Sequence, residues 1–146
     1  MIGINDNRTV NFVTVIETYR LEGEKMNNKV VYDYDCKGDS LFIYCVENYE
    51  YEVSLELDND VILDIDKEGK PVAFEFLNVS KIFNLDKIHF NNLSKITIQS
   101  NITEESINLK VQLAVPIHNK TQTFGMNRIT TNLNGIPATE AELVTV

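Results

Sequence analysis

Residues 51–76 read YEVSLELDNDVILDIDKEGKPVAFEF, and this stretch decides the fold class. Apolar and polar residues alternate through it, which is the pattern of a strand with one buried face. Polar turns at residues 58–60 and 67–70 interrupt the alternation. The stretch therefore predicts an antiparallel meander of three strands with one apolar face.

The same alternation predicts how these strands pair, because a slip of one residue would turn one strand's apolar set outward. We expect Leu57 to pair with Val61 across the first turn and Asp66 with Pro71 across the second. The register then gives these further pairs on the apolar face: Leu55–Leu63, Val53–Ile65, Ile65–Val72, Leu63–Phe74 and Val61–Phe76.

A hairpin precedes the meander. If Asp35 pairs with Ser40 across a four-residue loop, six alternating residues share one face: Val30, Tyr32, Tyr34, Leu41, Ile43 and Cys45. This register places Cys36 in the loop and Cys45 at the far end of the ladder. We therefore expect two thiols rather than a disulfide, which a cytoplasmic protein of this size does not need.

The rest of the chain is also mainly strand. The predicted elements are a strand at Val10–Tyr19, a connector at Arg20–Asn28, a short helix capped by Asn78, strands at Lys95–Gln99 and Ile107–Ile117, a poorly patterned segment at Thr121–Leu133 and a last strand at Leu143–Val146. The fold class that follows is mainly β: an antiparallel meander or sandwich-like sheet with one short helix. At 146 residues the chain is expected to form a single domain, 1–146.

The charge is concentrated in the middle of the chain. The net charge is −9, and residues 31–75 alone contain thirteen Asp and Glu against three Lys. Nucleic acid and anionic membrane surfaces are therefore disfavoured partners, because both are bound through Lys and Arg. No apolar run reaches the roughly 20 residues that cross a bilayer, and the N-terminus does not resemble a signal peptide, so we expect a cytoplasmic protein.

Two motifs resemble those of a known family. The run YDCKGDSLFI at residues 34–43 is similar to the opening motif, Tyr-Asp then Asp-x-Leu-x-Ile, of the domain of unknown function 2283 family. The run DVILDIDKEGK at residues 60–70 is similar to the second motif, and LNVSK at residues 77–81 follows as in that family. The resemblance covers about residues 31–83 and marks them as a β-meander core, with residues 1–30 and 84–146 as strand extensions. It implies a small microbial protein with no established activity, cofactor or catalytic residue.

A calcium-loop spacing overlaps the second turn. Asp64, Asp66, Glu68, Gly69 and Glu75 occupy positions 1, 3, 5, 6 and 12 of the loop template. An EF-hand needs flanking helices, whereas the flanking residues alternate as strands do, so a hairpin turn is the preferred interpretation.

A second cation hypothesis rests on the predicted sheet rather than on the loop. The register sets Glu52 opposite Asp66 and puts Glu75 diagonal to Asp64, and like charges across a ladder are destabilising. Solvent, a basic partner surface or a divalent cation such as Ca²⁺ could relieve this repulsion. The candidate metal ligands are therefore Asp64, Asp66, Glu75 and Glu52.

Catalysis is harder to assemble from this sequence. The two histidines, His89 and His118, belong to no recognisable pairing with a cysteine, and no residue pattern suits zinc or a nucleotide phosphate. No catalytic or cofactor-binding residue is assigned. The first hypothesis is thus a non-enzymatic interaction or assembly module that self-associates as a homo-oligomer or binds another protein, and the alternative is calcium binding on the acidic face.

Overall fold

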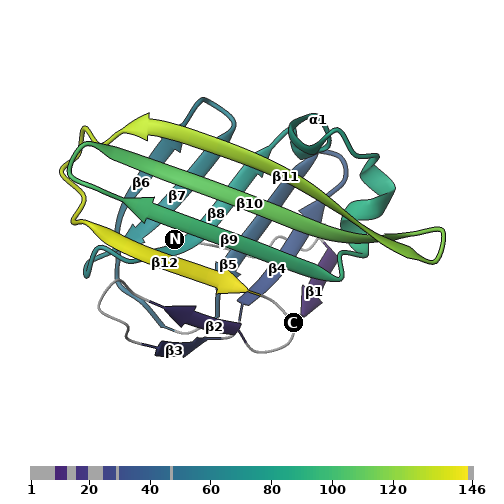
Figure 1. The fold of residues 1–146 in the computed structure, drawn as a ribbon, viewed down its shortest axis with the longest axis horizontal. Coiled ribbons are helices and arrows are strands. Elements are labelled where there is room, and N and C mark those ends of the chain that lie inside the picture. The colour runs from purple at the N-terminus through teal and green to yellow at the C-terminus, as the bar shows by residue number, and fades with distance from the viewer. Residues whose placement is uncertain (1–8, 13–15, 20–24, 29, 47, 145–146) are drawn as a thin grey trace.

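The computed structural model describes residues 9–12, 16–19, 25–28, 30–46 and 48–144. They form two antiparallel six-stranded sheets stacked face to face, with the strands of one crossing obliquely over those of the other (Figure 1). The mainly β prediction with one short α-helix is confirmed.

Sheet A has the strand order β1-β4-β5-β8-β7-β6. Its strands are β1 (Thr9–Phe12), β4 (Val30–Asp35), β5 (Ser40–Cys45), β6 (Tyr51–Leu57), β7 (Val61–Asp66) and β8 (Pro71–Leu77). Sheet B has the order β11-β10-β9-β12-β2-β3. Its strands are β2 (Ile16–Tyr19), β3 (Lys25–Asn28), β9 (Lys95–Ile102), β10 (Ser106–Ile117), β11 (Lys120–Thr131) and β12 (Thr139–Val144). The α-helix α1 (Val79–Phe83) and the 3₁₀ helix η1 (Lys87–Asn91) connect the two sheets.

Most of the predicted register of sheet A is confirmed. Asp35 pairs with Ser40, and Leu57 pairs with Val61. These pairings put the apolar side chains of β4, β5, β6, β7 and β8 on the inner face, as alternation requires. The predicted pairs Leu55–Leu63, Val53–Ile65, Leu63–Phe74 and Val61–Phe76 are all present.

The second turn breaks the predicted register. Ile65 pairs with Pro71 and Asp64 with Ala73, so Val72 is an extra residue in β8. The predicted pairs Asp66–Pro71 and Ile65–Val72 are therefore wrong. A bulge next to a proline is physically reasonable, because proline has no N–H to give to the ladder.

Three further predictions need correction. The predicted strand Val10–Tyr19 is two strands, β1 and β2, which belong to different sheets, and the predicted connector contains β3. The poorly patterned segment Thr121–Leu133 is almost entirely strand β11. The last strand, β12, starts four residues earlier than predicted, and residues 145 and 146 lie outside the described part.

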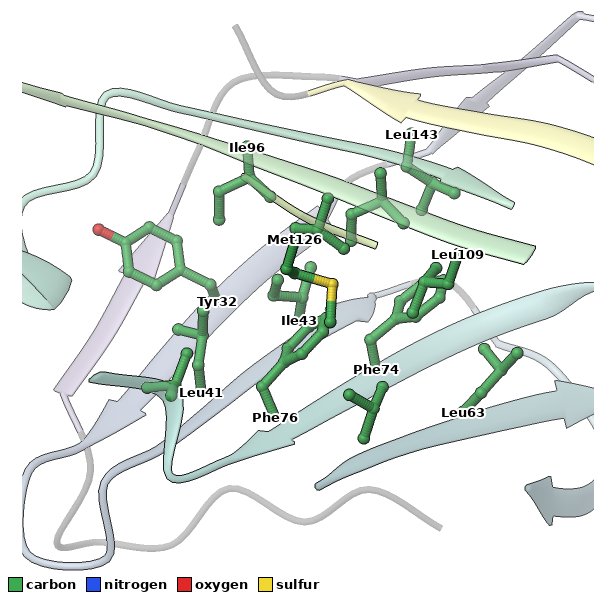
Figure 2. Packing of buried hydrophobic residues seen from close by; sticks show 14 of the residues in the cluster. Tyr32, Leu41, Ile43, Leu63, Phe74, Phe76, Ile96, Leu109, Met126 and Leu143 are labelled. Atoms are coloured by element: carbon green, nitrogen blue, oxygen red, sulfur yellow. The ribbon is translucent and has the colours of Figure 1, made fainter. Parts of the chain in front are cut away.

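The core lies between the sheets. Figure 2 shows Phe74 and Phe76 of sheet A pointing toward Leu109 and Met126 of sheet B. Both phenylalanines are at most 1% exposed. Sheet B therefore covers the apolar face that the meander presents, and each fully buried side chain of this size contributes about 2–3 kcal/mol.

Candidate functional site

Three of the acidic residues predicted to line one face, Glu56, Asp64 and Glu75, lie on the outer face of sheet A, across β6, β7 and β8. In β7 the inward Leu63 is fully buried, whereas its neighbours Ile62 and Asp64 are only partly buried. Ser54 is opposite Asp64 and Glu56 is opposite Ile62, as predicted. This outer surface of β6, β7 and β8, together with Phe42 of β5, is called the acidic face below.

A hollow of about 330 Å³ indents the acidic face. It is lined by Phe42, Ser54, Glu56, Ile62, Asp64, Ala73, Phe74 and Glu75. Glu75 pairs with Phe42 on one side and Ile62 on the other, so a carboxylate lies between two apolar side chains. The hollow thus combines an apolar floor with the carboxylates of Glu56, Asp64 and Glu75.

Asp64 is held in place by a short chain of hydrogen bonds. The Ser54 hydroxyl donates to Asp64 Oδ1 over 2.6 Å, and the Tyr51 hydroxyl lies 2.8 Å from Ser54 Oγ. Asp64 also acts on Tyr49, whose pKa is raised to about 12, first by burial and then by the negative charge of Asp64. Sequence reasoning missed Tyr49, because it lies in the connection between β5 and β6, where no alternation marks it.

Asp66 serves the turn rather than the hollow. It is 7% exposed, and its Oδ1 accepts hydrogen bonds of 2.9 Å from the backbone N–H groups of Glu68 and Lys70. Gly69 adopts a φ of +80°, a conformation that glycine alone tolerates readily. The calcium-loop spacing is therefore that of a tight hairpin turn, which confirms the preferred interpretation.

Glu52 does not lie opposite Asp66, so that prediction is wrong. Tyr51 pairs with Asp66 and Val53 pairs with Ile65, which leaves Glu52 as an extra residue in a bulge. A bulge turns its side chain away from the regular alternation. The predicted diagonal relation of Glu75 to Asp64 is present, because Glu75 pairs with Ile62 and Asp64 with Ala73.

Of the four candidate metal ligands, the hollow is thus lined only by Asp64 and Glu75. Within the described residues, no group of three or more His, Cys, Asp or Glu side chains is placed to hold a metal ion. Calcium binding by Asp64, Asp66, Glu75 and Glu52 stays a prediction.

The other candidate residues are dispersed. His118 is exposed in the turn between β10 and β11, and His89 is partly buried in η1. Cys36 is exposed and Cys45 buried, and the two are not joined in a disulfide, as predicted. Each of these four residues lies in a different strand, helix or turn.

A buried polar cluster explains the first sequence motif. Asp39 is 7% exposed and has a φ of 51°. Its carboxylate accepts hydrogen bonds from the hydroxyl of Tyr34 at 2.9 Å, the hydroxyl of Ser80 at 2.6 Å and the backbone N–H of Ser80. Burial and the charge of Asp39 together raise the pKa of Tyr34 well above its ordinary value. The motif residues therefore fasten α1 to the β4–β5 hairpin.

This cluster also corrects the predicted helix cap. Asn78 precedes α1 as expected, but it adopts a left-handed conformation and makes no capping hydrogen bond with its side chain. Asp39 takes that role from a distant part of the chain: its carboxylate accepts from Ser80 N–H and its carbonyl from Val79 N–H. The sequence signal was present in the motif aspartate, but local spacing cannot reveal a cap supplied by another element.

None of the described helices is long and apolar enough to cross a membrane.

Comparison with known proteins places the chain among archaeal relatives. It is 34% identical over 106 residues to a protein of Methanosarcina mazei described as a putative hypoxanthine phosphoribosyltransferase, covering 73% of this chain and 85% of the relative. It is 40% identical over 86 residues to an uncharacterized protein of Methanocaldococcus jannaschii, covering 58% of this chain and 72% of that relative. No solved structure gives a significant match.

The family model described as protein of unknown function (DUF2283) matches residues 27–80, which include both sequence motifs and strands β4 to β8. The resemblance noted from the motifs is therefore confirmed, and the chain belongs to the DUF2283 family.

Proposed function

We propose that the protein is a non-enzymatic interaction module that binds a basic segment of a partner protein on its acidic face. The observation that carries this proposal is the hollow of about 330 Å³, in which Phe42 and Ile62 supply apolar surface beside the carboxylates of Glu56, Asp64 and Glu75.

A lysine or arginine side chain has the shape and chemistry that this hollow fits. Its methylene stem packs against apolar groups while its charged end reaches carboxylates or water. Charge complementarity of this kind also speeds association and selects against acidic partners. The exposed acids Glu50 and Glu52, near the start of β6, extend the negative charge beyond the hollow.

A fluorescein-labelled synthetic peptide in which arginine alternates with leucine is a suitable probe. We expect binding measured by fluorescence anisotropy to weaken as salt is raised. The double variant Glu56→Gln and Asp64→Asn should weaken it by roughly five- to thirty-fold, because an exposed ion pair contributes up to about 1 kcal/mol. The Asp64→Asn change keeps a side-chain oxygen that can accept the hydrogen bond from Ser54.

The matched control is Glu104→Gln with Glu105→Gln. These exposed acids lie in the turn between β9 and β10 and remove the same charge from the other sheet. Equal weakening by both double variants would show attraction by net charge alone and would overturn the assignment to the hollow, as would no binding by the unaltered protein.

The activity in the description of the Methanosarcina mazei relative is not proposed for this chain. A phosphoribosyl transfer site has to hold a diphosphate and its magnesium, commonly at a helix N-terminus and with carboxylates. The one α-helix in the described residues has five residues, and its first N–H groups are occupied by Asp39. No observation favours a second function.

We place the proposed interaction in the cytoplasm. The exposed thiol of Cys36 and the buried thiol of Cys45 suit a reducing compartment.

A further inference from the structure

Among the described residues, strand β11 is an edge of sheet B. It pairs with β10 along all of its twelve residues, and it is the first strand in the order of that sheet. Figure 1 shows it along one border of the molecule, with the β10–β11 turn projecting past the end of β9. Strands average about five to six residues, so this is a long edge, and long edges are templates for pairing with another chain.

The turn between β10 and β11 determines which backbone groups point outward. His118 and Asn119 form a two-residue turn with φ values of 50° and 62°, so Ile117 and Lys120 close the ladder as a hydrogen-bonded pair. Alternate residues of β11 then bond to β10, and the others turn their N–H and C=O groups away from it. The outward set is Thr121, Thr123, Gly125, Asn127, Ile129 and Thr131.

Asn127 supports this assignment. Its carbonyl oxygen accepts a hydrogen bond of 3.2 Å from the guanidinium group of Arg128, which is possible because that carbonyl points away from β10. The same Arg128 forms an ion pair of 2.9 Å with Asp60 and one of 3.6 Å with Asp58. These ion pairs fasten the edge strand to the β6–β7 turn of sheet A and hold it in a defined position.

Exposed apolar side chains lie at the same edge. Ile129 is 60% exposed and Leu133, just beyond the strand, is 85% exposed. A groove of about 150 Å³ lies at Leu133, lined by residues of β6 and by Ile107, Thr130, Thr131, Leu133 and Asn134. An apolar rim next to outward backbone groups is the arrangement of an interface rather than of a solvated edge.

We propose that β11 pairs antiparallel with β11 of a second copy of this chain, with Asn127 of both copies at the two-fold axis. The Asn127 carbonyl then exchanges its contact with Arg128 for the N–H of Asn127 in the other copy. In this register Ile129 lies opposite Gly125 of the other copy, so the one large exposed apolar residue of the strand covers its one glycine. Arg128 lies opposite Met126, and no like charges face each other. Pairing over residues 123–131 forms about eight hydrogen bonds, because the Thr131 carbonyl already accepts from the Leu133 N–H, and this number is within the range of a whole interface.

A second copy is the occupant that the edge fits best because the strand is complementary to itself. A two-fold axis always pairs the outward backbone groups of one copy with the outward backbone groups of the other. Here it also places Ile129 against Gly125 of the other copy. This interface uses sheet B, whereas the hollow of the proposed function lies on the outer face of sheet A. The failure of either proposal therefore leaves the other standing.

Sedimentation equilibrium over micromolar to near-millimolar concentrations tests the association, and hydrogen exchange followed by NMR tests its location. We expect twice the mass of one chain and slow exchange at the outward N–H groups of Thr123, Gly125, Asn127 and Ile129. A monomer throughout this range would overturn the proposal. A dimer in which these groups exchange as fast as exposed amides would overturn it too, because the contact would then lie elsewhere.

Asn127→Pro removes one outward N–H without touching the ladder to β10, and an edge strand tolerates proline at such a position. We expect a monomer with an unchanged circular dichroism spectrum, whereas the matched control Asn127→Ala should remain a dimer. Ile129→Lys changes an exposed side chain and introduces no proline, so the folding of this variant does not depend on whether the strand accepts one. It should weaken the dimer by roughly tenfold or more, since an edge lysine opposes pairing. Dimers of unaltered affinity in both Asn127→Pro and Ile129→Lys would contradict the proposal.

Discussion

The hydroxyl of Ser80 donates a hydrogen bond of 2.6 Å to the carboxylate of Asp39, across 41 residues of sequence. The contact lies between a hairpin loop and the start of α1, and Tyr34 joins it from β4. In this contact, Tyr34 and Asp39 of the first family motif have a structural role.

We predict that Asp39→Ala lowers the free energy of unfolding by about 2–4 kcal/mol. The change leaves the hydroxyl of Tyr34 and the groups of Ser80 without their acceptor, and a buried donor without a partner costs about 1–3 kcal/mol. Asp39→Asn should cost less, because asparagine keeps one acceptor oxygen and tolerates the left-handed backbone. Urea unfolding measures both, with exposed Asp86→Ala as the control. A loss for Asp39→Ala no greater than for the control would contradict the structural role.

The role of Gly69 in the second turn can be tested by comparison with Gly135, which lies between β11 and β12. Both have positive φ, at +80° and +61°, but a Cβ at Gly69 would lie 3.2 Å from the ring of Pro137, while one at Gly135 meets nothing within 4 Å. We expect Gly135→Ala to cost about 1 kcal/mol for the backbone alone. Gly69→Ala should cost more, by the contact with Pro137. Thermal unfolding of the two variants gives the comparison, and equal losses would show that the proline moves aside freely.

The raised pKa values of three tyrosines predict that the protein loses stability at alkaline pH. Burial raises the pKa values of Tyr32 and Tyr34, and it raises that of Tyr49 to about 12, above the ordinary value near 10. A tyrosine whose pKa is higher in the folded than in the unfolded state makes its full contribution to the free energy of unfolding below about pH 10. That contribution is lost as the pH rises toward the pKa of the folded state. Urea unfolding should show constant stability from pH 8 to about 10 and a decline from about 10 to 12. A flat profile through this range would be inconsistent with buried phenols.

Asp64→Asn should lower the pKa of Tyr49 without returning it to the ordinary value. Burial is the larger cause of the shift and is unaffected, whereas the charge of Asp64 is removed. Titration of the phenolate absorbance near 295 nm, compared with a Tyr49→Phe variant that identifies the signal, measures the change. Glu104→Gln serves as a remote control of equal charge.

Calcium binding can be tested without any variant. Thermal unfolding in chelator, in millimolar calcium and in millimolar magnesium at matched ionic strength tests the predicted ligands, among which Asp66 also accepts turn hydrogen bonds and Glu52 lies in a bulge. Curves that coincide would contradict calcium binding there. A rise of several degrees with calcium alone would mean a site on the native state. Asp64→Asn would then be expected to abolish that rise.

Alternation was sufficient to predict the pairing within most of sheet A, because each of its strands has one strongly apolar side. It failed at Glu52 and Val72, where a bulge adds one residue to a strand and no local signal marks the addition. It also failed for β11, whose inward positions include Arg128 and Thr130 as well as Met126. A polar inward residue satisfied by an ion pair to another element is invisible to a hydrophobic pattern.

Residues 107–117, whose alternation predicted a strand, form β10, which is flanked by β9 and β11. The acidic face was predicted in its main residues, since period-two spacing decides which side chains share a face. Its hollow was not, because an indentation depends on how Phe42 and Ile62 fill the space between strands.

Most of sheet A precedes most of sheet B in the chain, and this order has a consequence for folding during synthesis. The residues that match the family model build most of sheet A, while strands β9 to β12, which follow them in the chain, cover its apolar face. A nascent chain that has emerged only through α1 therefore exposes Phe74 and Phe76 without the later strands of sheet B that bury them. Productive folding has to wait for residues 95–144, so cellular yield should depend on chaperones that shield the unfinished half during translation.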